Sequence, residues 1–280
     1  MWFPDRAVFM FLNYNQDVLK NGINTVTAKV GTYAENVFCT EVLAYESEQA
    51  FRKFGMINDD NWEDILKFSK ARTKIGCDFV NFPFKSFSQI GLQMLICVRD
   101  PSSDKYRIVF SRKTTKDPVP SEIYQCVPEA GFNVAPMNHS GNYSKEEIEG
   151  SFHIGGSLFR KFLTDAIGAS EISSNSSVGD ILQDPHVIRI ERMLQNSSAR
   201  FYFLGDCMDI LHMRHELSFV LFIDDPEEFP YEFEGASMVK KDRLITDFSI
   251  DDLAEHPEIV ENFHGCSVGM MKLVQDLGIQ

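Results

Sequence analysis

The sequence lacks the short motifs that mark the common nucleotide-binding and hydrolase sites. It contains no P-loop, no GxGxxG and no GxSxG. The glycine-rich stretch Gly155–Ser157 is without the lysine that a phosphate cradle requires. A Ser/His/Asp triad assembled by folding would leave no such signature, and no residue here indicates one. Motifs therefore do not specify a reaction.

Paired cysteines are also missing. The six cysteines form no CxxC pair, and several lie in apolar runs, as Cys97 does. A chain of 280 residues can bury a core without disulfides. We therefore expect reduced thiols and a cytoplasmic location. The cysteines are Cys39, Cys77, Cys97, Cys126, Cys207 and Cys266.

Basic residues are scarce: 27 Lys and Arg stand against 41 Asp and Glu, which gives a net charge of −14. Such a chain is repelled by the nucleic-acid backbone and by anionic lipid, so we expect no broad nucleic-acid binding. No apolar run approaches the length of a membrane span, and we expect no membrane association. The hydrophobic segment 1–12 carries an acidic residue and no small-residue cleavage site, which favours a strand over a signal peptide.

The first part of the chain shows both strand and helix patterns. Residues 7–12 and 25–30 have strand character. Ser47 is expected to cap a short helix that stops at Gly55, and Asp60 or Asn61 a second one that contains Trp62. The run 78–87 contains a proline, which favours an edge strand or loop. We expect a mixed region over 1–88, whose strands either stand apart or join the sheet that follows.

The rest of the chain predicts an α+β core over residues 89–280. Strands 90–98 and 106–111 flank a turn and predict a hairpin. Ser144 and Glu147 form a capping box for a helix that runs to Gly168, with a possible break at its central glycines. The further expected elements are a strand at 123–127, a linker at 170–179, an extended segment at 187–194, strands at 200–204 and 217–223, and helices at 251–255 and 267–277.

The segment His212–Glu216 (HMRHE) suggests zinc at first sight, but it matches neither HExxH nor HxxEH. A strand begins directly after it, which leaves little room for a helix that would bring the two histidines together. We therefore interpret it as a loop or a strand start whose His and Arg side chains pair with nearby acids.

The order of elements from 90 to 223 resembles the Nudix fold, a mixed sheet flanked by helices. Strand YRIVFS is followed by Arg112-Lys113, strand YQCV by Pro128-Glu129-Ala130-Gly131, and the helix ends KFLTDAIGA at 161–169. The resemblance implies a nucleotide-like ligand. Where the family has REUxEExGU, however, this chain has Lys161-Phe162 in place of Arg-Glu. Asp165 and Ala166 stand in place of the two metal-binding glutamates.

The departures weaken the case for Mg²⁺ chemistry, because such a site needs several carboxylates on one helix face. Asp165 could join Glu146, Glu147 or Glu149 only if the glycines fold the helix back on itself. First-turn acids more often stabilise a helix dipole. Two basic groups could instead bind an anion: Arg112 with Lys113, and Arg160 with Lys161.

Three functions follow as hypotheses. The first is a non-catalytic Nudix-like module that binds a nucleotide-like ligand or a protein partner, as a sensor or regulatory subunit. The second is a divergent Mg²⁺-dependent hydrolase of nucleoside diphosphate derivatives. The third is an interaction protein that uses its acidic 224–234 loop. A homo-oligomer stays open in each case.

Overall fold

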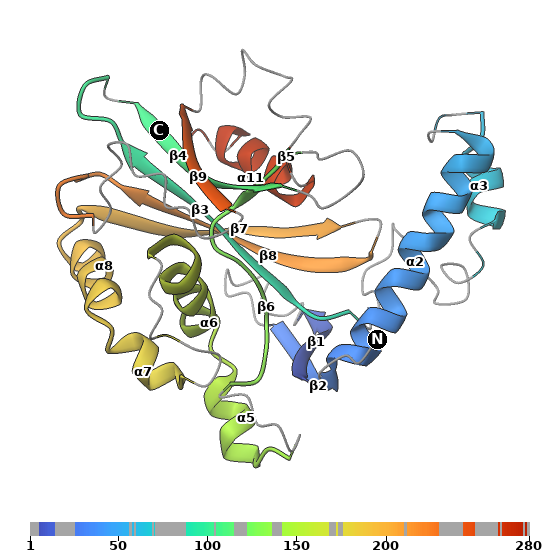
Figure 1. Ribbon diagram of the computed structural model, residues 1–280, viewed down its shortest axis with the longest axis horizontal. Helices are drawn as coiled ribbons and strands as arrows, with labels where there is room; N and C mark the ends of the chain where they lie inside the picture. Colours follow the sequence, from blue (N-terminus) through green and yellow to red (C-terminus); the bar gives the residue numbers. More distant parts are fainter. Residues whose placement is uncertain are drawn as a thin grey trace.

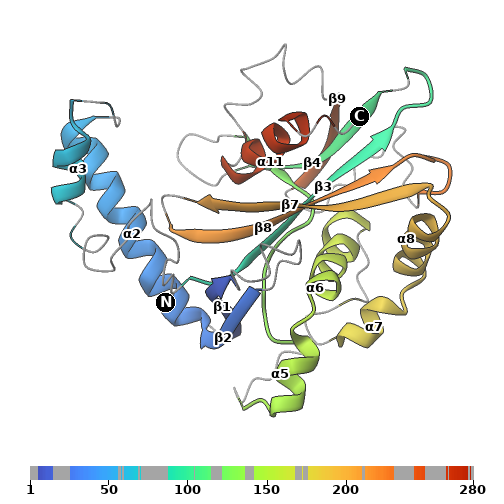
Figure 2. The ribbon, with the colours of Figure 1, turned by 180° about the vertical axis from the view of Figure 1, so that it is seen from behind.

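The computed structural model describes residues 6–14, 26–55, 58, 60–68, 70, 88–103, 105–114, 122–135, 142–167, 172, 176–209, 212–229, 243–249, 263, 265–276 and 278. Within these residues the chain is α+β: a large mixed sheet has α11 on one side and α6, α7 and α8 on the other (Figures 1 and 2). The predicted fold class is confirmed. The segments predicted at 78–87 and 251–255 lie outside the described residues.

The central strand of the sheet is β3, the apolar run of the sequence. It pairs antiparallel with β4, which confirms the predicted hairpin, and parallel with β8. The short strand β6 also pairs with β3. On one side of the sheet β5 and β9 pair with β4, and on the other side β7 pairs with β8. The strands are β3 (Gly91–Arg99), β4 (Tyr106–Thr114), β5 (Glu122–Cys126), β6 (Glu129–Gly131), β7 (Ala199–Asp209), β8 (Arg214–Ile223) and β9 (Arg243–Ser249).

Both faces of β3 are buried, which explains its continuous apolar sequence. Leu92, Met94 and Ile96 belong to the core beneath α6 and α8. Leu95 and Cys97 alternate with them and belong to a second cluster beneath α11 (Gly265–Asp276). The sheet therefore separates two cores.

The cysteines confirm the expectation of free thiols wherever the structure describes them. Cys39, Cys97, Cys126, Cys207 and Cys266 are not in disulfides, and Cys77 lies outside the described residues.

The N-terminal strands form a separate two-stranded sheet, β1 (Ala7–Tyr14) with β2 (Val26–Thr32). β1 is nevertheless tied to the main body. Phe9 N donates to Phe132 O at 2.9 Å, and Ile90 N donates to Phe9 O at 2.9 Å. Phe9 and Phe11 are buried in the same core as β3. β1 and β2 thus keep a sheet of their own and do not add strands to the main one, while the side chains of β1 share its core.

The short helix predicted to begin at Ser47 is part of a much longer one. α2 runs from Tyr33 to Phe54 and projects from the body of the molecule (Figure 1). Its capping box is made by Thr32 and Glu35, while Ser47 is buried and bonds back to Leu43 O. The predicted start was wrong because the capping box of Thr32 and Glu35 begins the helix earlier, and Ser47 lies in its interior. The predicted stop at Gly55 is confirmed, and so is the next helix, α3 (Trp62–Phe68).

The segment 187–194, predicted as extended, is also helical. α8 (Pro185–Gln195) begins with Asp184 as N-cap and proline in the first turn. Its buried residues Val187, Ile190 and Met193 recur every three positions, which is a helical spacing. The other apolar residues of the segment made this spacing hard to recognise in the sequence. None of the helices in the described residues has the length and apolar content to cross a membrane.

The predicted helix from Ser144 to Gly168 is broken in its middle, as its glycines suggested. α5 (Lys145–Ser151) has the expected capping box of Ser144 and Glu147. α6 (Ile154–Lys161) starts afresh at His153, whose Nδ1 accepts from Gly156 N at 2.8 Å. It continues directly into a π-helical turn, η1 (Phe162–Ile167). The linker predicted at 170–179 leads into α7 (Val178–Leu182).

Candidate functional site

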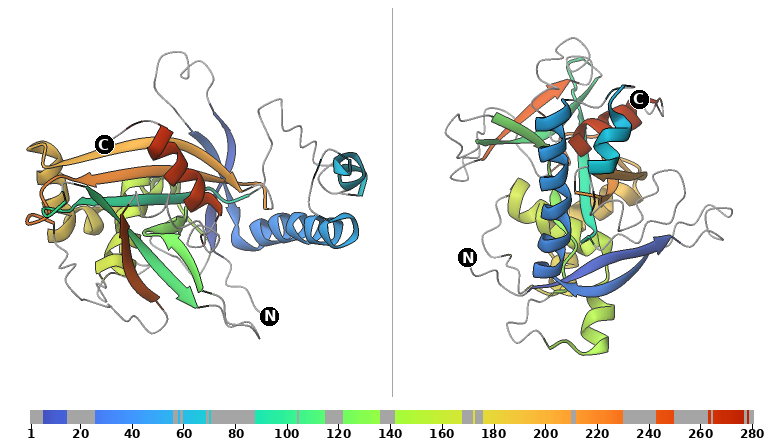
Figure 3. Two further views of the ribbon diagram at one scale, coloured as in Figure 1. Left: turned by 90° about the horizontal axis from the view of Figure 1, so that it is seen from above. Right: turned by 90° about the vertical axis from the view of Figure 1, so that its right-hand side faces the viewer.

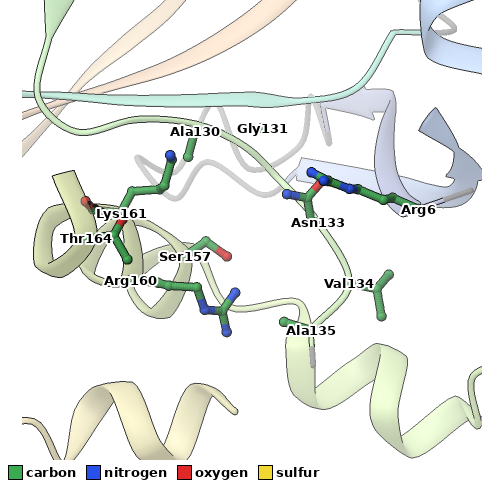
Figure 4. Close-up of a pocket in the computed structure, with 10 residues that line it drawn as sticks. All are labelled: Arg6, Ala130, Gly131, Asn133, Val134, Ala135, Ser157, Arg160, Lys161 and Thr164. Atoms are coloured by element: carbon green, nitrogen blue, oxygen red, sulfur yellow. Dashed lines mark hydrogen bonds between the residues drawn. The ribbon is translucent and has the colours of Figure 1, made fainter. Parts of the chain in front are cut away.

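The α6–η1 segment and the strand β6 enclose a polar cavity of about 230 Å³. One wall is the backbone from Ala130 to Ala135, and the other is the outward face of α6 and η1 (Figure 4). The described lining residues are Arg6, Ala130, Gly131, Asn133, Val134, Ala135, Ser157, Arg160, Lys161 and Thr164.

The wall formed by α6 and η1 is fixed by the core on its far side. Leu158, Phe162 and Leu163 are buried beneath the sheet. The positions next to them therefore carry the polar groups of Ser157, Arg160 and Lys161 to the cavity. The π-helical turn follows directly, a feature that is frequent at functional sites.

Three cations reach the cavity from two elements that are far apart in sequence. Lys161 extends towards Ala130, Arg160 lies below it, and Arg6 enters from the opposite wall beside Asn133 (Figure 4). None of the ten described lining residues carries a carboxylate. In a chain with a net charge of −14, this is a local reversal of sign.

Arg160 is the most constrained of the three cations. Its Nη2 donates to Ser176 O at 2.8 Å, in the segment that leads into α7. Its Nε is sealed from solvent and has no hydrogen-bond partner within the described structure. Burial lowers the pKa of Arg160 below its ordinary value, but guanidinium stays protonated in proteins. The site therefore holds a charged group that is only partly satisfied.

Asp165, the one acid predicted from the Nudix-like helix, already interacts with two neighbouring side chains. Its carboxylate lies 3.0 Å from Lys161 Nζ, and Thr164 Oγ1 donates to it at 3.1 Å. An aspartate in this position fixes Lys161 and balances part of its charge. Neither Arg6 nor Arg160 forms an ion pair with a carboxylate among the ion pairs of the described residues.

The other acidic candidates lie on α5, a different helix. Glu147 closes the capping box by accepting from Ser144 N at 2.7 Å, and Glu149 lies 3.6 Å from Lys145. Glu146 is exposed in the first turn. No group of three His, Cys, Asp or Glu side chains among the described residues could hold a metal ion. The structure thus does not assemble Asp165 with Glu146, Glu147 and Glu149 into a Mg²⁺ site.

Of the two predicted basic pairs, one lies at the cavity. Arg160 and Lys161 both line the cavity. Arg112 and Lys113 lie in β4, where their backbones face Tyr124 and Ile123 of β5, and their side chains lie outside the described part of the structure.

Arg6 and Asn133 were not anticipated from the sequence. Arg6 sits in a hydrophobic opening segment, and only the bonding of β1 to the 132–134 segment brings it to the cavity. The single signal that could have indicated it is that a charged residue directly precedes the apolar strand.

Polar pairs surround the HMRHE segment on both faces of the sheet: Glu216 lies on the α11 face with Val220 and Phe222, and His215 lies on the opposite face, stacked on Phe11. His212 Nδ1 is 2.7 Å from Asp209, His215 pairs with Asp206, and Arg214 contacts the Glu216 carboxylate. Arg214 also lies 3.7 Å from Glu129. The predicted pairing of the His and Arg residues with nearby acids is confirmed.

Glu216 is the unusual member of these pairs. It is 1% exposed, and its Oε2 has no hydrogen-bond partner within the described structure. Burial raises the pKa of Glu216 to about 8, and this outweighs the opposing effect of Arg214. The carboxyl lies so close to Gly91 that a Cβ there would be 1.8 Å from Glu216 Oε2. Glycine at 91 is therefore what makes room for a buried acid.

The acidic loop is described as far as residue 229, and there its acids serve the fold. Asp224 accepts from Arg200 Nε at 2.9 Å and from the Tyr106 hydroxyl. Burial raises the pKa of Asp224, but these hydrogen bonds outweigh it and hold the pKa below its ordinary value. Glu228 accepts from Ser198 at 2.8 Å. Residues 230–234 lie outside the described part.

No family model and no curated protein sequence matches this chain. The Nudix resemblance therefore stays a prediction from the sequence. The chemistry of the cavity is argued below from its own residues.

Proposed function

We propose that this protein binds a small, phosphate-bearing, nucleotide-like ligand in the α6–β6 cavity without hydrolysing it, as a sensor or regulatory module. The observation that carries the proposal is the convergence of Arg6, Arg160 and Lys161 on one cavity whose described lining has no carboxylate. A phosphate is the common small anion that such a set of donors recognises.

The arginine side chains of the cavity contribute a large part of the binding free energy that a phosphate-bearing ligand requires. At an effective dielectric constant of about 20, two unit charges about 4 Å apart attract by about 4 kcal/mol. A charge-assisted hydrogen bond retains about 1.5–3 kcal/mol after its desolvation cost. Two such bonds from Arg6 and Arg160 contribute about 3–6 kcal/mol. Contacts with the rest of a nucleotide-like ligand supply the remainder of the ~8 kcal/mol that micromolar affinity requires.

The hydrolase alternative loses support from the same residues. Asp165 is bonded to Lys161 and Thr164, and the acids of α5 are engaged in capping and in an exposed ion pair. A single carboxylate neutralises too little charge to hold Mg²⁺. Binding without turnover is what this arrangement favours.

The experiment is a thermal-shift screen of the full chain with pyrophosphate, ADP, a nucleotide sugar and a dinucleoside polyphosphate, each with and without Mg²⁺. We expect a rise in melting temperature that does not depend on Mg²⁺, because a ligand that binds only the folded state stabilises it. Turnover of the same compounds is measured in parallel. Turnover on the order of one per second that is abolished by Asp165→Asn would replace the sensor with the hydrolase.

A further inference from the structure

The outer edge of the sheet carries a patch of aromatic side chains on β7. Phe201, Tyr202 and Phe203 are 38%, 39% and 39% exposed. Within the described residues β7 pairs with β8 alone, and Figure 3 shows it as the outermost strand on its side of the sheet. Exposed sheet edges of this kind are templates for pairing with another strand.

The three aromatic residues are divided between the two faces of the strand. Phe201 and Phe203 both pack on Phe219, with ring centroids 5.5 and 5.2 Å apart. Tyr202 points to the other face, where its ring lies 6.3 Å from that of Phe222. The strand thus offers aromatic surface on both sides of its free edge.

The charges that usually protect an edge strand are missing from this stretch. Between Ala199 and Gly205 the one charged residue is Arg200. Its guanidinium is held by Asp224 at 2.9 and 3.0 Å and lies over the Phe222 ring. A β-bulge between Phe203 and Gly205, where Gly205 has φ of 144°, ends the regular edge. The unprotected stretch is therefore residues 199–203.

We propose that this edge pairs with β7 of a second copy of the chain, antiparallel and two-fold symmetric about Tyr202. In this register Tyr202 faces its own copy, and Phe201 faces Phe203 of the other molecule on the same side of the sheet. Cross-strand aromatic pairs of this kind are favourable. Arg200 falls opposite Leu204, so no like charges meet, and an isologous contact closes as a dimer.

The area limits the strength of this contact. A large aromatic side chain presents roughly 200 Å², so three of them at about two-fifths exposure contribute roughly 80 Å² each. Six side chains from two molecules then expose roughly 500 Å² in total. This is the most that they can bury, and it is well below the ~1,600 Å² of a standard interface. The dimer is therefore a weak one that forms only at high protein concentration.

The register gives a charge-exchange test by analytical ultracentrifugation over a wide concentration range. Phe201→Lys combined with Phe203→Lys places like charges opposite each other, and the Kd should rise at least tenfold. Phe201→Lys combined with Phe203→Glu places each lysine opposite a glutamate of the other copy, and the dimer should recover to within about threefold. Phe38→Lys on α2, at a side chain that is 74% exposed, is the control and should change nothing.

A cross-link tests the same register without disturbing Phe201 or Phe203. Opposed residues of antiparallel strands have Cα atoms about 4.5–5.5 Å apart, within the range of a disulfide. Tyr202→Cys should therefore give a covalent dimer on mild oxidation, whereas Tyr45→Cys on α2 and the unmodified protein should not. A monomer at several hundred micromolar, or a dimer that withstands the two lysines, would overturn the proposal. Failure of the Lys/Glu variant to recover, while circular dichroism shows it folded, would do the same.

Discussion

Replacing Glu216 with glutamine should reverse its effect on stability between acid and neutral pH. The Glu216 carboxyl is buried beside Gly91 and Arg214, and its pKa is raised to about 8 in the folded protein. In the unfolded chain the same carboxyl titrates near its ordinary pKa of about 4.3. Between these values the folded state holds a proton that the unfolded state has lost.

The sign follows from proton linkage. The stabilising contribution of protonated Glu216 is fully present below the unfolded pKa, and it is lost as the pH rises through the folded pKa. Each pH unit in this window costs about 1.4 kcal/mol. From pH 5 to pH 7 the native protein should therefore lose up to about 3 kcal/mol through this one group. Glu216→Gln keeps the shape and the hydrogen-bonding capacity but cannot ionise, so it escapes this loss.

The measurement is urea unfolding at pH 5, 6, 7 and 8. We expect Glu216→Gln to be equal to or slightly less stable than the native protein at pH 5 and more stable at pH 7. Glu149→Gln removes an exposed carboxylate on α5 and serves as the control with little effect on the pH dependence. A difference between Glu216→Gln and the native protein that does not change with pH would refute the reasoning.

Three further predictions follow from the same structure. Gly91→Ala should destabilise the protein by about 1–3 kcal/mol in thermal unfolding, because its Cβ would meet the Glu216 carboxylate at 1.8 Å; Gly150→Ala, which meets nothing within 4 Å on helix α5, should instead be neutral or stabilising by about 0.5–1 kcal/mol. All six cysteines should titrate with a thiol reagent in the denatured, unreduced protein, while Cys97 and Cys126 should react slowly in the native state because burial raises their pKa values; fewer than six thiols, with air oxidation prevented, would contradict this. Asp165→Asn should not lower any Mg²⁺-dependent turnover of nucleoside diphosphate derivatives, since its carboxylate serves Lys161; a loss of turnover in a coupled phosphate assay would count against the non-catalytic account.

Local signals predicted much of the fold. The continuous apolar run at 90–98 identified the central strand because burial on both faces removes the alternation of a half-exposed strand. The Ser144–Glu147 spacing located a helix start, since a capping box is a local device. Both depend on residues within a few positions of one another.

Predictions failed where two local signals competed. Thr32 and Ser47 are both favoured cap residues, but only Thr32 has a glutamate three positions on, and this capping box with Glu35 starts α2. At 187–194 the run of apolar and charged residues suited a strand as well as a helix, and Asp184 with Pro185 settles the outcome.

The cavity was half predictable for a related reason. Arg160 and Lys161 are neighbours in sequence, so a basic group was visible there. Arg6 and Asn133 join them only because β1 is hydrogen-bonded to the 132–134 segment, a long-range pairing with no local signature. Long-range contacts of this kind cannot be derived from spacing alone.

The most direct test of the central claim is a calorimetric titration of the native protein with the phosphate compound that gives the largest thermal shift. The matched variants are Arg160→Gln, which lines the cavity, and Arg192→Gln, which removes an exposed arginine on α8. The account predicts micromolar binding that weakens with salt, a Kd at least tenfold higher for Arg160→Gln, and an unchanged Kd for Arg192→Gln. Absence of binding by the native protein at millimolar ligand, or equal affinity in Arg160→Gln, would contradict it.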